Sequence, residues 1–455
     1  MNNERLGNPE FQAEMPVTYK ETMNYMKEIN REISPLLRDA VASIDDQGSR
    51  EMVNYFFEPR YNKPKGRPLL TRLSFELTAD LMQQAEPSLE NSPALDPKMI
   101  NNLLVAIRLL DGTSILHDDI LDHDETRDSS EKEPERESVW KKYKKETDLG
   151  VEKAMIAGEK SHELANIFFR QAIDDQERIY VGLARQSDNA QIYPMENRIV
   201  TVLNQPDSEA KIKMDTAIHK KVIAIWDSIW DQGYSGQRQD YEEFGRDTTP
   251  TIEVYEQRMY LLTGQFHEKV MLLGAYAAGL DDEGEGREIL EALGSYGKYY
   301  GVAAQLRNDL LDFVPEGGFN QGTAADRKFK YQDFVEGKQT MPLILAREKC
   351  SPEDWEYIHS KLGKKDITIE EKQRINEILV SYNIFKDCER RIFELSKMAI
   401  AELDKIPGGS RKKEMLKTCA LIESNMIKRS FAGEDTNAQD IKLDSLEDLE
   451  KYFSE

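Results

Sequence analysis

The chain has 455 residues, with 61 Lys or Arg against 84 Asp or Glu, which gives a formal net charge of −23. With 39% hydrophobic and 32% charged residues, its composition is that of a globular protein rather than a disordered one. A surface this acidic repels the phosphates of nucleic acid, so we expect no nucleic-acid partner. A phosphorylated ligand would need metal cations or a few concentrated basic side chains.

The cysteine content and the length of the apolar runs bear on the cellular location of the protein. Three widely spaced cysteines, Cys350, Cys388 and Cys419, indicate neither a disulfide framework nor a zinc site. Residues 1–12 contain no apolar stretch of the signal-peptide kind. The longest apolar run, 270–280, is too short for a membrane span, which needs about 20 residues. We therefore expect a cytoplasmic protein without a transmembrane segment.

Apolar residues recur at every third or fourth position along most of the chain, which predicts an all-α fold. We expect an N-terminal helical segment over 1–50, one catalytic domain over 51–432, and an acidic C-terminal tail over 433–455. The tail is either solvated or forms a short helix. The predicted helices cover 99–121, 152–169, 218–230, 254–280 and 289–313, with another from Leu69. The predicted loops are 57–68, 128–138, 317–331 and a surface insertion over 185–212.

The strongest chemical signal is the segment 117–127, HDDILDHDETR, which follows an apolar helix. Asp118 and Asp122 are four residues apart, so their carboxylates project from one helical face about 6 Å apart. Two acids held this way repel each other, and a cation relieves the repulsion. Ligands that offer only oxygen suit Mg²⁺, which keeps several waters and shares phosphate oxygens. The alternative interpretation is a solvated helix end.

A second helix carries a similar acidic group, because Asn308, Asp309 and Asp312 fall within little more than one turn after Gln305. Two inward-facing acidic helices in one bundle can hold metal between them, whereas a salt-bridged surface is the alternative. Further along, Lys338 precedes a helix that begins with a proline. Its ammonium group is a candidate phosphate anchor near the positive end of that helix, although most lysines are simply solvated.

Together these segments resemble the trans-isoprenyl diphosphate synthase (polyprenyl synthetase) family. The segments 117–127 and 305–313 are similar to its two aspartate-rich motifs, and 333–343 resembles its D-x-x-E-G-K-x-T-L-P segment. The resemblance covers about residues 57–346, in the same order. Three shorter matches support it: Gly236, Gln237 and Asp240 for G-Q-x-x-D, Thr263 and Gly264 for K-T-G, and Arg67 and Pro68 for the end of G-K-R-x-R-P.

The resemblance implies an isoprenoid synthase-type helical bundle around a deep central pocket, with the acidic motifs facing each other across its mouth. It implies three Mg²⁺ ions, an allylic prenyl diphosphate substrate that is ionised, and a homodimer. The carbocation then joins isopentenyl diphosphate or another acceptor. The implied metal ligands are Asp118, Asp119, Asp122, Asn308, Asp309 and Asp312; the catalytic residues are the first three with Arg127 and Lys338; and the substrate-binding residues are Arg67, Arg127, Gln237, Asp240, Thr263, Gln305 and Lys338.

The sequence departs from the family on the acceptor side. Arg67 is kept, but Pro64 stands where the family has a lysine, Asp111 where it has a histidine, and Asp128 where it has an arginine. A carboxylate in place of a neutral or positive group adds repulsion against a diphosphate. The resemblance therefore implies a degenerate isopentenyl diphosphate site.

Three functions stay open on these residues. The first is prenyl transfer, either to isopentenyl diphosphate or to another acceptor. The second is a terpene synthase of the same fold, in which the cation is cyclised or quenched without an acceptor. The third is an inactive partner subunit that has kept the fold.

The residues just before the first acidic motif bear on product length. By the resemblance, the small Thr113 and Ser114 should leave the pocket deep enough for long chains, whereas close helix packing is the alternative. Asp111 lies two turns from Asp118 on the same helical face. One interpretation of Asp111 is a structural acid that pairs with a basic residue.

Overall fold

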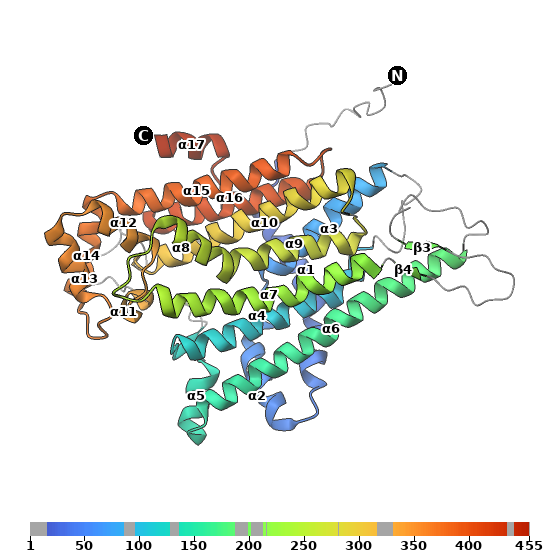
Figure 1. Cartoon of the computed structure of the whole chain (residues 1–455), viewed down its shortest axis with the longest axis horizontal. Coiled ribbons are helices and arrows are strands. Elements are labelled where there is room, and N and C mark those ends of the chain that lie inside the picture. The colour runs from blue at the N-terminus through green and yellow to red at the C-terminus, as the bar shows by residue number, and fades with distance from the viewer. Residues whose placement is uncertain are drawn as a thin grey trace.

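The computed structural model describes residues 16–85, 96–127, 136–186, 199–201, 213–214, 216–280, 282–315, 331–434 and 441–454. Over these residues the chain is a bundle of long helices, which confirms the predicted all-α class (Figure 1). The strands in the described part form two small antiparallel ribbons. They pair β1 (Thr126–Arg127) with β2 (Arg136–Glu137) and β3 (Ile199–Thr201) with β4 (Lys213–Met214).

The first half of the bundle comprises α1 (Tyr19–Ala42), α2 (Gln47–Phe57), η1 (Glu58–Arg60), α3 (Gly66–Ala85), η4 (Pro97–Ile100), α4 (Asn101–Leu121), α5 (Val139–Thr147) and α6 (Gly150–Gln186). The central helices are α7 (Thr216–Glu243), α8 (Ile252–Met259), the π-helical turn η5 (Tyr260–Gly264), α9 (Gln265–Ala278) and α10 (Gly284–Leu311). The last third comprises α11 (Gln332–Glu336), α12 (Met341–Lys349), α13 (Pro352–Lys361), α14 (Ile369–Ser381), α15 (Ile384–Asp404), α16 (Arg411–Ala432) and α17 (Leu446–Ser454).

The helix α4, which carries the first acidic motif, lies at the centre of the core. It packs on α6, while α3 packs on α9, α9 on α10 and α10 on α15 (Figure 1). With η4 it forms the one helix of the described part that is long and apolar enough to cross a membrane. Other helices bury 72% of its most apolar stretch, so its apolar length is explained by burial in the bundle.

Two glycines allow the helices around the second acidic motif to approach closely. A Cβ on Gly301 of α10 would lie 2.8 Å from the Cα of Gly264, at the crossing with η5 and α9. A Cβ on Gly236 of α7 would lie 2.9 Å from the backbone nitrogen of Leu262 in η5. The π-helical turn is therefore held between α7 and α10, which sets the position of Thr263.

The predicted helices are all present in the described part, with different ends. The first of them begins at Gly66 instead of Leu69, and the predicted helix 254–280 is interrupted by η5. Most of the predicted insertion 185–212 and of the loop 317–331 lies outside the described residues. The division into domains stays a prediction, and its boundary after residue 50 falls inside α2.

The acidic C-terminal segment ends in a helix. In α17, Leu449 and Phe453 are buried against Phe393 of α15, and the Phe393 and Phe453 rings stack with centroids 5.1 Å apart. Leu449 and Phe453 therefore face the bundle, whereas Glu447 and Asp448 of the same helix are exposed.

Candidate active site

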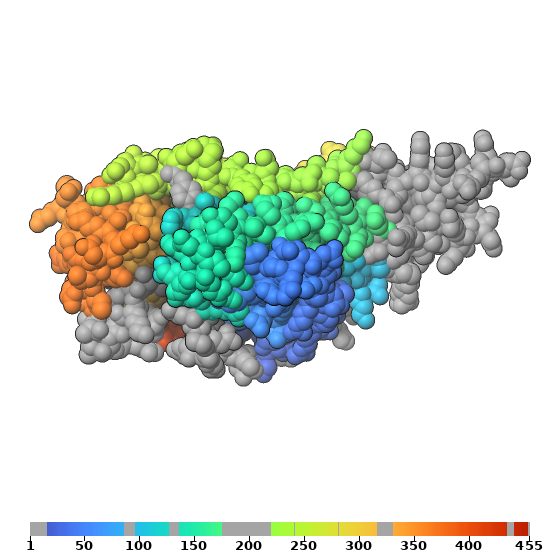
Figure 2. All heavy atoms as spheres, turned by 90° about the horizontal axis from the view of Figure 1, so that it is seen from below, coloured from blue at the N-terminus to red at the C-terminus, as the bar shows by residue number. Residues whose placement is uncertain are grey.

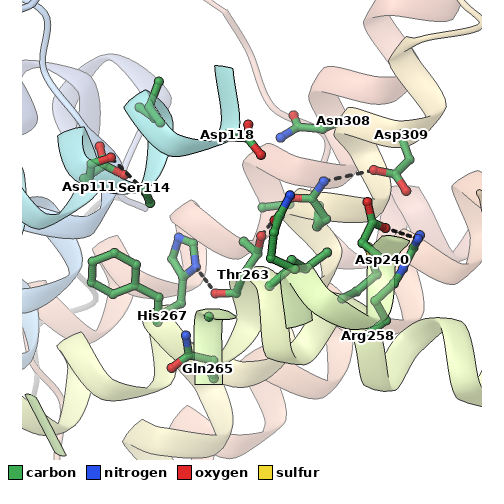
Figure 3. Close-up of a pocket in the computed structure, with 18 of the residues that line it drawn as sticks. Asp111, Ser114, Asp118, Asp240, Arg258, Thr263, Gln265, His267, Asn308 and Asp309 are labelled. Carbon is green, nitrogen blue, oxygen red and sulfur yellow. Dashed lines mark hydrogen bonds and ion pairs between the residues drawn. The ribbon is translucent and has the colours of Figure 1, made fainter. Parts of the chain in front are cut away.

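A cavity of about 700 Å³ opens between α3, α4, α7, η5, α9, α10 and α16, and the loop before α12 also lines it. Figure 3 shows part of its lining, with Asp118 of α4 and Asn308 and Asp309 of α10. Of the thirteen predicted site residues, eleven line it: Arg67, Asp118, Asp122, Gln237, Asp240, Thr263, Gln305, Asn308, Asp309, Asp312 and Lys338. The described fold thus brings segments that are up to 271 positions apart in the sequence to one cavity.

The first acidic helix presents only part of its motif to the cavity. Asp118 and Asp122 line the cavity, whereas Asp119 is 2% exposed and lies on the other side of α4, in a small pocket with Arg60 and Arg136. The reason is the helical period, which turns adjacent residues by about 100°. The backbone of Arg127 pairs in β1, and its side chain lies outside the described residues.

Lys338 joins the first acidic helix to the loop before α12. Its Nζ lies 2.9 Å from Oδ2 of Asp122, 3.0 Å from Oε2 of Glu336, 3.5 Å from Oδ1 of Asp333 and 3.9 Å from Oδ2 of Asp240. Burial opposes its charge, but these carboxylates, Asp333 first, raise the pKa of Lys338 above its usual value. The ammonium group is therefore a permanent positive charge at the acidic side of the cavity.

The second acidic helix is held by a chain of hydrogen bonds from η5 and α8. The Tyr255 hydroxyl donates to Oδ2 of Asp309 at 2.7 Å, and the Gln305 amide donates to Oδ1 at 2.9 Å. The Thr263 hydroxyl donates to the Gln305 oxygen at 2.8 Å (Figure 3). Thr263 and Gln305 thus orient Asp309, which is 4% exposed.

The last acid of this helix organises the chain that follows it. Oδ1 of Asp312 accepts a hydrogen bond from the backbone N–H of Gln332 at 2.7 Å, and Oδ2 accepts one from Phe334 at 3.4 Å. Burial, with the nearby Asp333 carboxylate, raises the pKa of Asp312 to about 8. Asp312 therefore fixes the start of α11, which in turn positions Lys338.

The cavity holds more acid than its basic groups can neutralise, because nine carboxylates and five Lys or Arg side chains line it. Burial raises the pKa of Asp240 and Asp309, that of Asp333 to about 6, and that of nearby Glu336 to about 7. Among the described residues, no three acidic, His or Cys side chains are grouped closely enough to be a formed metal site. The oxygen-only donors and the excess of negative charge nevertheless fit a hard divalent cation.

The other end of the cavity has an ion pair on its surface. Arg67, whose guanidinium carbon lies 4.3 Å from the Phe266 ring centre, pairs with Asp111, and Arg108 lies 3.6 Å from the second oxygen of Asp111. This answers the question left open by the sequence, because Asp111 is an acid with two basic partners. Apolar side chains form the walls between the two ends: Leu110, Ile115, Ile229, Trp230, Met259, Leu262 and Phe266.

Only one of the two small residues before the first acidic motif reaches the cavity. Ser114 lines it, but Thr113 is fully buried and donates to the carbonyl oxygens of Leu109 and, at 3.3 Å, of Gly158 in α6. The expectation that Thr113 deepens the pocket is therefore wrong: the residue packs two helices together.

Several residues of the cavity were not identified from the sequence. Arg258 is 2% exposed, pairs with Asp240 and lies over the Phe244 ring, so it anchors Asp240 from α8. Glu423 reaches the cavity from α16, far beyond the recognised motifs, and Arg307 lies beside it. A buried charge inside an amphipathic helix is a weak signal in one sequence, because its partner is visible only after folding.

Comparisons with known proteins agree with this geometry. The model of the family described as polyprenyl synthetase matches residues 201–379, a range that contains the second acidic motif and Lys338. A short chain isoprenyl diphosphate synthase of Methanothermobacter thermautotrophicus is 26% identical over 271 residues, which cover 60% of this chain and 63% of that protein. The chain thus matches somewhat less than two thirds of the length of that relative.

Solved structures share the fold. A geranylgeranyl pyrophosphate synthetase from Pyrococcus horikoshii superposes with a TM-score of 0.62 at 19% identity, covering 91% of this chain and 98% of that one. A second solved structure is a geranylgeranyl pyrophosphate synthase from Corynebacterium glutamicum, complexed with isoprenyl diphosphate and magnesium. It superposes with a TM-score of 0.58 at 17% identity, covering 92% of this chain and 100% of that one. Residues 201–379 thus match the polyprenyl synthetase family model, and the chain shares the fold of these solved synthases.

Proposed function

We propose that the protein is a Mg²⁺-dependent prenyltransferase that ionises an allylic prenyl diphosphate in this cavity and joins the resulting cation to an acceptor. The observation that carries the proposal is the meeting of two acidic helices, α4 and α10, at one cavity whose walls are apolar. The acidic end suits a diphosphate with its cations, and the apolar walls suit a prenyl chain. The relative named as a short chain isoprenyl diphosphate synthase supports the same activity.

Magnesium would be held by Asp118 and Asp122 on one side and by Asn308, Asp309 and Asp312 on the other, all of which offer oxygen. The bound magnesium of the C. glutamicum enzyme supports this choice of ion, and we keep three ions as the proposed number. When bound, Mg²⁺ supplies positive charge that stabilises the diphosphate as it becomes a leaving group.

The basic side chains of the protein would bind the diphosphate, and the apolar walls of the cavity would protect the cation. We propose that Lys338, which lines the cavity, binds the diphosphate oxygens, and that Gln237, Asp240 and Thr263 orient the groups around it. Arg127 keeps the same proposed role from the resemblance of its motif. The apolar walls exclude water, which would otherwise capture the cation. We propose a positioning role for Asp119, because it lines a separate small pocket together with Arg60 and Arg136.

The acceptor site is proposed to be degenerate for isopentenyl diphosphate. Arg67, the one retained contact, already pairs with Asp111, and the carboxylate adds repulsion against a diphosphate. The same observation favours a second candidate function, a terpene synthase that needs no acceptor.

We also propose a homodimer in the cytoplasm. The described part has twelve exposed large apolar side chains, and seven lie on α6, α7 and the turn before α6: Leu149, Val151, Met155, Ile156, Ile167, Ile223 and Tyr234. Both helices run along one side of the bundle (Figures 1 and 2). An exposed apolar surface of this kind is typical of an interface. Light scattering after gel filtration gives the mass directly, and a monomer at micromolar concentration contradicts the proposal.

Incubation with Mg²⁺ and allylic diphosphates of ten, fifteen and twenty carbons, with and without isopentenyl diphosphate, tests the function. Transfer predicts pyrophosphate release together with a longer or conjugated product identified by mass. Release of the same amount without an acceptor, with a hydrocarbon or alcohol product, supports the terpene synthase. No release from any donor contradicts both and leaves the inactive subunit.

A further inference from the structure

The cavity contains, near Tyr300, a carboxylate that no recognised motif includes. Glu423, on α16, is 3% exposed and lines the cavity together with Tyr300 and Arg307 of α10. Oε2 of Glu423 forms an ion pair with Arg307, with 2.7 Å between this oxygen and Nη1. The Tyr300 hydroxyl also hydrogen-bonds to this carboxylate. The carboxylate is thus buried, lines the cavity, and is held by two neighbours.

This part of the cavity is poorly suited to a second diphosphate. Its two arginines that line the cavity, Arg67 and Arg307, each have a carboxylate partner already, Asp111 and Glu423. The imidazole of His267 is uncharged, because burial lowers its pKa to about 3. An incoming diphosphate would have to displace two buried carboxylates or lie against them.

A carboxylate has about four acceptor positions, so Glu423 can still accept a hydrogen bond from a molecule in the cavity that brings a donor. A hydrocarbon double bond offers Glu423 no hydrogen bond, whereas a hydroxyl group can donate one to its carboxylate. We propose that the cavity binds an uncharged alcohol beside Glu423 as the prenyl acceptor and that Glu423 receives the hydroxyl proton. This inference rests on the proposed ionisation of an allylic diphosphate in the same cavity.

The step balances with groups already named. The alcohol oxygen forms a bond to the first carbon of the allylic group with one of its lone pairs. The bond from that carbon to the diphosphate breaks, and its electron pair leaves with pyrophosphate. The hydroxyl proton moves to the Glu423 carboxylate, and the product is a prenyl ether. Burial raises the pKa of Glu423, which favours proton uptake.

A matched pair of probes tests the acceptor. The alcohol 3-methylbut-3-en-1-ol and isopentenyl diphosphate have the same carbon skeleton and differ only in the diphosphate. With farnesyl diphosphate and Mg²⁺, we expect the alcohol to give a farnesyl ether, and Glu423→Gln to lower its rate at least tenfold. Glu414→Gln, an exposed change on the same helix, is the control and leaves the rate unchanged. An elongated diphosphate, farnesol as the main product, or no effect of Glu423→Gln each overturns the inference.

Two binding measurements complete the test. Calorimetry with isopentenyl diphosphate in the absence of Mg²⁺ should show binding at least tenfold tighter to the Asp111→Asn/Glu423→Gln protein than to the wild type. Equal affinities of the two proteins for isopentenyl diphosphate overturn the inference. If the double variant does not fold, saturable micromolar binding of isopentenyl diphosphate to the wild type is enough to overturn it. Binding of an unreactive farnesyl thiolodiphosphate with Mg²⁺ separates the two proposals. If the wild type does not bind it, the proposed function fails, and the acceptor assignment fails with it.

Discussion

Replacing Lys338 by glutamine should destabilise the protein by removing a cation that lies close to four carboxylates. The ammonium group lies within 4 Å of Asp122, Asp240, Asp333 and Glu336, and its side chain is 17% exposed. Removal of one partner from a buried ion pair costs about 3–5 kcal/mol. For 455 residues, an unfolding entropy of about 2.1 cal/mol/K per residue converts this into a fall in Tm of about 3–5 °C.

Magnesium should reverse part of this loss. Without the ammonium group, the carboxylates repel each other more strongly and therefore attract a divalent cation more strongly. We expect 5 mM Mg²⁺ to raise the Tm of Lys338→Gln, measured by differential scanning fluorimetry against EDTA, by more than it raises that of the wild type. Lys349→Gln, which removes an exposed lysine paired with Asp387, is the control and should shift the Tm by less than 1 °C. An unchanged Tm for Lys338→Gln in EDTA refutes the electrostatic account.

Three other changes test separate parts of the structure. Asp118→Ala should abolish pyrophosphate release and leave the helical circular dichroism intact; retained turnover removes its assignment as a metal ligand. Burial raises the pKa of Glu389 to about 7, so its charge destabilises the fold increasingly above pH 4.5 and fully above 7. Glu389→Gln should therefore raise the free energy of unfolding at pH 8 by up to about 3 kcal/mol, and with it the Tm, but should change neither at pH 4. The control Glu394→Gln, at an exposed position, should show no such difference between the two pH values. Gly301→Ala should lower the free energy of unfolding by about 1–3 kcal/mol, because the added methyl group would lie 2.8 Å from a backbone atom. The control Gly245→Ala should leave the stability unchanged, because a Cβ at Gly245 would have no atom within 4 Å.

The sequence was sufficient to predict the parts of the fold that depend on local periodicity. The helix around Asp118 and the one around Asp309 follow from the spacing of apolar residues. The same period places Asp118 and Asp122 on one face, and it also turns Asp119 away from them. Grouping all three as metal ligands followed the motif rather than the helical geometry.

Tertiary pairings were beyond the sequence because they join positions that are far apart. Arg258 meets Asp240 across two helices, and Tyr255 meets Asp309 from 54 positions away. Glu423 enters the cavity from α16 only because α16 packs beside α10. No local pattern identifies such partners, since each is one polar residue on an otherwise ordinary helix.

The central claim is that the two acidic helices bind an allylic diphosphate together with Mg²⁺. Calorimetric titration of farnesyl thiolodiphosphate into the wild-type protein measures this directly, in 5 mM Mg²⁺ and again in EDTA. We predict saturable binding with Mg²⁺, at least a hundredfold weaker in EDTA, and lost in both Asp118→Ala and Asp309→Ala. Binding that is equally tight in EDTA, or that survives in either variant, would contradict it.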